Sequence, residues 1–222
     1  MLLPSVLRSN NSHHDRHTRE VEQMQYTPWQ RTCATGLAPL QRTILDEEAR
    51  IRLNRTWQPE LIIGLVQTER YARAVLSACI SVLGVPDDVD EVTKTRMQRQ
   101  RVLDQEGHEF WFLIGEAALR RTVGTHDIMT EQLAHLLDVM HKPSVSLGIV
   151  PLDAEYRAPG TGFVLHDDSQ ASTELVGGEI ILDDPEQIAL HTKTFDILSG
   201  QAVYREDAQQ LIETAMRTHQ SR

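Results

Sequence analysis

Residues 108–121 read HEFWFLIGEAALRR, and this stretch decides the fold prediction. Phe110–Ile114 is an unbroken apolar and aromatic run of strand length, and it begins where the helical period of the preceding residues ends at Gly107. A continuous run of this kind predicts a strand that is buried on both faces. We therefore expect a central strand that leads directly into a short helix over residues 115–121.

Short strands and amphipathic helices alternate after this run. Asp184 followed by Pro185 offers a helix cap and a proline at the first helical position, which predicts the start of a helix there. The other boundaries follow from hydrophobic periodicity and from Gly- and Pro-rich turns. The pattern predicts helices over 128–141, 183–199 and 205–218, and strands over 144–151, 162–166, 173–176 and 179–182.

The first half of the chain is predicted to be helical. Residues 38–55 have a helical pattern that ends at Trp57-Gln-Pro59, because the residue before a proline disfavours the helical conformation. Thr68 is a candidate N-cap for a second helix, and a third runs from the turn at Gly84 to about Gln105. We predict an α+β fold with a helical first half and, in the second half, a small mixed β-sheet with helices packed on one face. Residues 1–37 are expected to be a mobile tail and residues 38–222 one domain.

Composition restricts the classes of function. The chain has 222 residues, 40% hydrophobic and 24% charged, and a net charge of −10. Contacts to phosphates require many basic residues, so this charge argues against autonomous DNA binding. Cys33 and Cys79 lack a metal-ligand or redox spacing and are expected to be reduced thiols. With no membrane-spanning run and no signal peptide in the sequence, we expect a cytoplasmic protein.

Six residues are candidates for a ligand-binding site. Glu116, Arg120 and Arg121 follow the central strand, where two arginines could bind an anionic ligand; the alternative is a structural i,i+4 pair of Glu116 with Arg120. Gln67 and Tyr71 could line a pocket or could only begin a helix. Trp111, like Trp57, could stack on a ligand, although a core position is favoured. The candidate set is Gln67, Tyr71, Trp111, Glu116, Arg120 and Arg121.

Other charged residues are expected to be structural. Arg96, Arg99 and Arg101 form the nearest thing to a basic patch, and we favour a solvated helix face over a nucleic-acid contact. No nucleophile, phosphate-loop or metal-ligand motif is present in the sequence. We therefore predict no cofactor and no metal centre, and catalytic residues stay unknown.

Several ordered motifs resemble one family. Trp57, Pro59, Leu61, Gly64, Leu65, Gln67, Thr68, Tyr71, Ala72 and Arg73 match its W-x-P-x-L-x-x-G-L-x-Q-T-x-x-Y-A-R pattern, and Arg96, Arg99, Gln100 and Leu103 match R-x-x-R-Q-x-x-L. Trp111, residues 116–121 and Gly124, then residues 129–137 and 182–186, continue the series. Over about residues 38–218 the chain resembles the DUF5753 domain, which is also described as an Scr1-family antitoxin-like transcriptional regulator domain.

This resemblance implies a regulatory role in actinobacteria. Family members usually carry an XRE-type helix-turn-helix before the domain, but the 37 residues here are polar and too few for that module, so DNA binding is not carried over. The family also tends to have an aromatic residue and an acidic strand near Glu174, where this chain reads TELVGGEIIL. A different ligand is expected if that strand lines a pocket.

The resemblance and the composition lead to alternative functions. We expect a stand-alone regulatory domain that senses a small-molecule ligand or binds a small partner protein, without a membrane contact; a homodimer stays open. The alternative is an enzyme of specialised metabolism that has reused the sensing pocket, with Glu116 and Arg120 as the place for its chemistry. A weak direct nucleic-acid role of Arg96, Arg99 and Arg101 is a third alternative.

Overall fold

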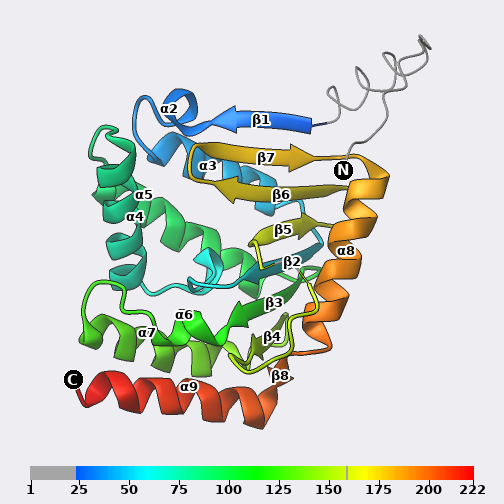
Figure 1. Cartoon of the computed structure of the whole chain (residues 1–222). Coiled ribbons are helices and arrows are strands. Elements are labelled where there is room, and N and C mark those ends of the chain that lie inside the picture. The colour runs from blue at the N-terminus through cyan, green and yellow to red at the C-terminus, as the bar shows by residue number, and fades with distance from the viewer. Residues whose placement is uncertain (1–23, 159) are drawn as a thin grey trace, which may run out of the picture.

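The fold is α+β, built on one mixed sheet. The computed structural model describes residues 24–158 and 160–222. Among these residues the sheet order is β1-β7-β6-β5-β2-β3-β4-β8, which Figure 1 shows from top to bottom. The strands are β1 (Met24–Pro28), β2 (Leu53–Gln58), β3 (Glu109–Gly115), β4 (Val145–Val150), β5 (Phe163–His166), β6 (Gln170–Leu175), β7 (Gly178–Leu182) and β8 (Val203–Tyr204).

The helices lie around this sheet in three groups. They are α2 (Trp29–Thr32), α3 (Ala38–Glu48), η1 (Gly64–Val66), α4 (Glu69–Leu83), α5 (Val89–Arg99), η2 (Gln100–Asp104), α6 (Glu116–Arg120), α7 (His126–Val139), α8 (Pro185–Ser199) and α9 (Arg205–Gln220). Two predicted caps are confirmed: the Thr68 hydroxyl accepts from Tyr71 N at the start of α4, and Asp184 caps α8 with Pro185 after it. Gly84 ends α4 at φ 64°, a left-handed conformation that glycine adopts without strain.

The predicted central strand is confirmed as β3. It pairs in parallel with β2 on one side and with β4 on the other, so both of its edges are hydrogen-bonded. Phe112 and Ile114 are fully buried on one face, and Leu113 is buried on the other. Trp111 is the exception, because 43% of its surface is exposed. The prediction of a core position therefore holds for Trp57, at 4% exposure, and is wrong for Trp111.

Strand β2 corrects the sequence prediction for residues 49–58. The helix that was expected to reach Arg55 ends at Glu48, and Leu53–Gln58 joins β3 and β5. The polar residues of this segment made a buried strand hard to predict from the sequence. In the structure, their side chains form hydrogen bonds with one another or with a neighbouring loop. The Thr56 hydroxyl donates to Asn54 Oδ1 (2.6 Å), and Arg55 Nη2 contacts Asp168 Oδ1 (2.6 Å). Buried polar side chains are tolerated when they are paired in this way.

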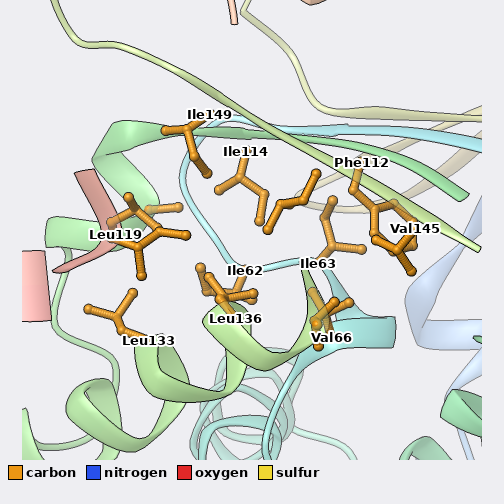
Figure 2. Packing of buried hydrophobic residues seen from close by; sticks show 14 of the residues in the cluster. Ile62, Ile63, Val66, Phe112, Ile114, Leu119, Leu133, Leu136, Val145 and Ile149 are labelled. Carbon is orange, nitrogen blue, oxygen red and sulfur yellow. The ribbon is translucent and has the colours of Figure 1, made fainter. Parts of the chain in front are cut away.

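Both faces of the sheet are covered, so the prediction of helices on one face is wrong. On the first face, side chains of β3 and β4 pack against α7, α9 and the segment around η1. Figure 2 shows this packing, with Ile62 and Val66 beside Leu136 and below Phe112 and Ile114. On the second face, α8 covers Trp57 and Leu113 with apolar side chains. A mixed sheet with two apolar faces requires a layer on each side.

The first helices form a separate cluster at one end of the sheet. Apolar side chains of α3, α4 and α5 meet there, together with Cys33 and Leu37. Residues 24–37 were predicted to be part of a tail, but β1 pairs with β7, and Trp29 N donates to Gly177 O (3.0 Å). The folded unit therefore includes this segment, because the edge of β7 offers it backbone partners. Residues 1–23 of the predicted tail lie outside the described residues.

Candidate functional site

The segment between β2 and α4 places two of the candidate residues together. Gln67 and Tyr71 are both buried, at 3% and 0% exposure. Gln67 Nε2 donates to Ile62 O (2.7 Å), and Ile62 N donates to the Tyr71 hydroxyl (3.2 Å). The backbone N–H and C=O groups of Ile62 thus each form a hydrogen bond with a side chain from later in the sequence. The Tyr71 side chain is buried and its hydroxyl bonds to the backbone of Ile62, whereas the Oε1 atom of Gln67 points to another helix.

That helix is α5, whose arginines were predicted to form a solvated face. Arg96 Nη1 donates to Gln67 Oε1 (2.9 Å) and Arg96 Nε to Gln41 Oε1 (3.3 Å). Arg99 is only 8% exposed, and it binds Glu48 through Nε (2.8 Å) and Nη2 (2.5 Å). The prediction is therefore wrong for Arg99 and for the half-buried Arg96, while Arg101 is exposed.

We call this network of Gln41, Glu48, Gln67, Arg96 and Arg99 the Arg96 junction. Gln41 Oε1 also accepts from Arg99 Nη1 (2.5 Å), so one amide oxygen holds both guanidinium groups. Gln100 follows Arg99 in the R-x-x-R-Q-x-x-L motif, and its Nε2 atom donates to Gln67 O (2.5 Å). The junction connects α3, α5 and the segment before α4. Residues from two of the motifs that carry the family resemblance meet here, although they lie far apart in the sequence.

The charges of the junction are unbalanced. Arg99 forms a bidentate ion pair with the buried carboxylate of Glu48, which neutralises it. In the described part of the chain, no carboxylate lies within salt-bridge distance of Arg96. Burial, with the like charge of Arg99, lowers the pKa of Arg96 to about 10, and Glu174 partly opposes this. Arg96 is therefore a positive charge at neutral pH without a direct counterion.

The β6–β7 hairpin carries two acidic side chains, Glu174 and Glu179. Glu174 and Glu179 are register partners on neighbouring strands, so their side chains project from the same face of the sheet. The charge of Glu174 raises the pKa of Arg96 and that of Cys79 on α4. Burial raises the pKa of the half-buried Glu179, and Glu174 and Glu47 raise it further, while the Ser172 hydroxyl opposes the change. Among the described residues, neither of these carboxylates forms an ion pair with Arg96.

Glu116 and Arg120, together with the backbone of Leu152, form a structural bracket at the carboxyl ends of the parallel strands β3 and β4. Glu116 is 6% exposed, and its Oε1 accepts from Arg120 Nε (2.9 Å). Its Oε2 accepts from Leu152 N (2.9 Å), so both oxygens are occupied. Arg121 pairs with Glu60 (2.8 Å) at the surface. These contacts fit the structural interpretation of the Glu116–Arg120 pair.

We expect Glu116→Ala to lower the free energy of unfolding by about 1–2 kcal/mol, because Leu152 N loses a charged acceptor. Denaturant titration followed by circular dichroism measures this change. Glu186→Ala on the exposed surface of α8 is the control and should cost less than about 0.5 kcal/mol. Equal effects for the two variants would contradict the assignment of Glu116 to the bracket.

The structure separates Trp111 from the remaining candidates. Its side chain lies on the face of β3 opposite Phe112, because neighbouring side chains in a strand alternate. Gln67 and Tyr71 belong to the other face, near the cluster around η1. The sequence analysis did not select Gln41, Glu48 or Glu179. Gln67 was a candidate, and the R-x-x-R spacing of Arg96 and Arg99 was the signal for the arginines of this network, but that spacing was interpreted as surface charge.

Two hollows lie on the described surface. One, of about 330 Å³, is next to Arg99 between α3 and η2, and includes Leu45 and Gln98. The other, of about 680 Å³, follows α8 and includes Asp168 and Lys193. Neither is lined by any of the six candidate residues. Residues 24–158 and 160–222 contain no cluster of three potential metal ligands of the His, Cys, Asp or Glu type. They also form no helix that is both long enough and apolar enough to cross a bilayer.

The fold and the junction define an α+β domain in which a helical cluster is joined to a mixed sheet through the buried Arg99 and the half-buried Arg96. The chain belongs to the family described as a domain of unknown function, DUF5753, whose sequence pattern matches residues 41–214. No curated protein matches the chain.

Three solved structures show distant similarity. TrmBL2, an archaeal chromatin protein described as having a novel mode of DNA binding, is 10% identical with a TM-score of 0.43; the match covers 87% of this chain and 64% of TrmBL2, less than two thirds of its length. NucT from Helicobacter pylori is 10% identical (TM-score 0.44; 82% of this chain and 97% of NucT). Nuc from Salmonella typhimurium, a phospholipase D family member, is 8% identical (TM-score 0.43; 82% and 96%). These values are too low to support an inference about function.

Proposed function

We propose that this chain is a ligand-sensing regulatory domain, related to actinobacterial XRE-type transcription regulators, and that the Arg96 junction binds its ligand. The observation that carries the proposal is the charge of Arg96. A cation that has lost part of its hydration and lies beside a second cation is destabilised unless an anion accompanies it. Glu48 is already committed to Arg99, so the missing anion is best supplied by a ligand.

The geometry of Arg96 suits this role. Its Nε and Nη1 atoms donate to Gln41 and Gln67, which hold the guanidinium plane in place. Its Nη2 atom has no hydrogen bond to any described residue, so the Nη1–Nη2 edge keeps donors for a further acceptor. A planar edge with two donors matches a carboxylate. Because Arg96 is half-buried, solvent and small molecules reach it.

The position of the junction explains how binding could be transmitted. Gln41 and Glu48 lie on α3, the two arginines on α5, and Gln67 next to the cluster packed against the central strands. A ligand bound to Arg96 would strengthen the connection between the helical cluster and the sheet. A differential affinity of this kind is what a sensor needs to shift its conformational equilibrium. A partner protein could then recognise the surface of the stabilised state.

The hydrogen bonds of Glu116 argue against the alternative function, an enzyme with its chemistry at Glu116 and Arg120. A catalytic role at Glu116 and Arg120 would need a free carboxylate in a pocket. Both oxygens of Glu116 are instead occupied by Arg120 and by the backbone N–H of Leu152. These contacts favour sensing over catalysis, and the proposal therefore assigns no catalytic residue.

The proposal predicts that small carboxylates stabilise the protein through Arg96. We expect at least one of acetate, benzoate, phenylacetate, succinate and citrate to raise the Tm by about 3–6 °C at ten times its Kd, which corresponds to about 1.4 kcal/mol. Differential scanning fluorimetry measures the Tm, and calorimetric titration gives the Kd.

The variant Arg96→Met keeps the apolar stem and removes the charge, so it should abolish the stabilisation. Arg101→Met, at an exposed arginine of the following helical turn, is the matched control and should respond like the wild type. The Tm of each variant without carboxylate shows first that it is folded. Shifts that are equal in wild type and Arg96→Met, or absent in both, would overturn the proposal.

A further inference from the structure

Two histidines from distant parts of the chain meet outside the Arg96 junction, where α9 runs alongside α7 (Figure 1). His126 is the first residue of α7, His219 lies in the last turn of α9, and their Nδ1 atoms are 2.9 Å apart. His219 is only 3% exposed, and its Nε2 atom lies 3.0 Å from Leu119 O of α6. His126 is half-buried. The pair therefore connects the end of α9 to α6 and to the start of α7.

The contacts determine where the protons of this pair lie. A carbonyl oxygen only accepts, so His219 Nε2 carries a proton and, in the neutral ring, its Nδ1 atom holds the lone pair. That lone pair accepts from His126 Nδ1–H. The ring centroids are 5.2 Å apart, which is about the largest separation that the Nδ1 distance allows, so the two rings point straight at each other. This is the geometry of a hydrogen bond, because a metal ion bound to both nitrogens needs the rings at an angle.

The pair can hold one additional proton but not two. A first proton turns one ring into an imidazolium, whose Nδ1–H still donates to the lone pair of the other ring as a charge-assisted hydrogen bond. A second proton fills that lone pair, so two N–H groups and two positive charges face each other. Water screens this repulsion little, because His219 is almost fully buried. The second proton therefore breaks the hydrogen bond.

The charged groups around the pair do not favour the second proton. In the part of the chain that the structure describes, neither histidine forms a salt bridge. Charged side chains that lie within three residues of Leu119, His126 or His219 are Glu116, Arg120, Arg121, Asp127, Arg217 and Arg222. Glu116 is paired with Arg120, and Asp127 is exposed. The arginines outnumber the carboxylates, so these surroundings add positive charge to the pair.

We propose that the His126–His219 pair is a proton-sensitive latch, which holds the last turn of α9 against α6 and α7 at neutral pH and releases it in mild acid. The rest of α9 is held by apolar contacts, since Ala208, Ile212 and Ala215 are buried in the central cluster. Opening of the latch therefore frees the end of the helix without displacing the helix as a whole. This device does not depend on the Arg96 junction or on its ligand.

The direction of the pH effect follows from the numbers of bound protons. Histidines of an unfolded chain titrate near pH 6.5, so below about pH 6 the unfolded pair carries two additional protons and the folded pair carries one. Because the unfolded state binds more protons, stability falls as the pH falls, and the equilibrium constant of unfolding rises by up to about tenfold for each pH unit. Above about pH 7 both states are neutral, and this contribution disappears.

His219→Gln tests the latch, because glutamine offers an N–H to Leu119 O and an oxygen to His126 Nδ1–H but takes no proton. Urea denaturation of the full chain gives the unfolding constant at pH 7.5 and at pH 5.0. We expect this acidification to raise the constant of the wild type about tenfold more than that of His219→Gln. His126→Gln, at the half-buried partner, serves the same comparison if His219→Gln does not fold.

His141→Gln is the matched control, because His141 is an exposed histidine just after α7, and this variant should keep the pH dependence of the wild type. Burial lowers the pKa values of His135 and His166, and their contribution to the pH dependence is the same in every variant. A wild type and a latch variant that respond equally to acid would overturn the proposal.

Hydrogen exchange of the wild type locates the opening. After correction for the intrinsic exchange rates, the amides of residues 217–220 should lose at least tenfold of their protection between pH 7.5 and pH 5.0, while those of residues 209–215 lose less than threefold. Unchanged protection of the last turn would show that the pair stays closed in acid. An equal loss along all of α9 would show that acid loosens the whole helix, and either result contradicts the latch.

Discussion

Glu48→Ala is expected to lower the free energy of unfolding by about 3–5 kcal/mol, because it leaves Arg99 buried and unpaired. Glu48 and Arg99 are only 7% and 9% exposed at their side chains, and their ion pair is bidentate. Arg96 adds a second positive charge beside them. Equilibrium unfolding in urea measures the change.

A second ion pair between the same two helices provides the control. Arg42 of α3 and Glu91 of α5 are in contact at 2.5 Å, but their side chains are 52% and 62% exposed. Solvent screens such a pair, so Glu91→Ala should cost less than about 1 kcal/mol. The double variant Glu48→Leu/Arg99→Leu should recover much of the stability lost in Glu48→Ala. A cost below about 1 kcal/mol for Glu48→Ala would show that Arg99 finds another partner or reaches solvent.

The helix caps and the central strand could be predicted from the sequence because their signals are local. Phe110–Ile114 is a continuous apolar run, and Thr68 and Asp184 stand one residue before helical patterns. A strand buried on both faces and a capped helix both have short sequence signatures. These three features could therefore be predicted without knowledge of the partners they pack against, and the structure confirms them.

Strands β1 and β2 could not be predicted, because their stability comes from distant partners. Residues 53–58 are mostly polar, and their burial depends on Asp168 and on mutual hydrogen bonds such as that of Thr56 with Asn54. Residues 24–28 have little apolar pattern and depend on the edge of β7. Tertiary pairing of this kind overrides local propensity.

The junction was missed for the same reason. On α5 alone, Arg96 and Arg99 look like part of a charged helix face, and only Gln41 and Glu48 of α3 show that the face is internal. Gln67 was selected as a candidate because it follows an apolar segment, but its contact with Arg96 joins residues that lie 29 positions apart. A spacing rule for one helix contains no information about which helix covers it.

Gly115→Ala is expected to lower the free energy of unfolding by about 3 kcal/mol, near the upper end of the usual cost of overpacking. Gly115 ends β3, and a Cβ atom there would lie 2.4 Å from Pro59 O, a backbone atom that cannot rotate away. The backbone of Gly115 is in an ordinary conformation (φ −68°), so the cost is steric. Chemical denaturation with circular dichroism as the readout measures it.

Gly64→Ala is the matched control, because a Cβ atom at Gly64 would meet nothing within 4 Å. This variant should be neutral or more stable by about 0.5 kcal/mol, since alanine reduces the freedom of the unfolded chain. Gly115 lies against Pro59, at the start of the segment that contains Gly64 and that carries Gln67 to the Arg96 junction. Displacement of Pro59 by Gly115→Ala should therefore also weaken Arg96-dependent carboxylate binding, whereas Gly64→Ala leaves it unchanged. Equal stability of the two variants would show that the ends of β2 and β3 can separate without cost.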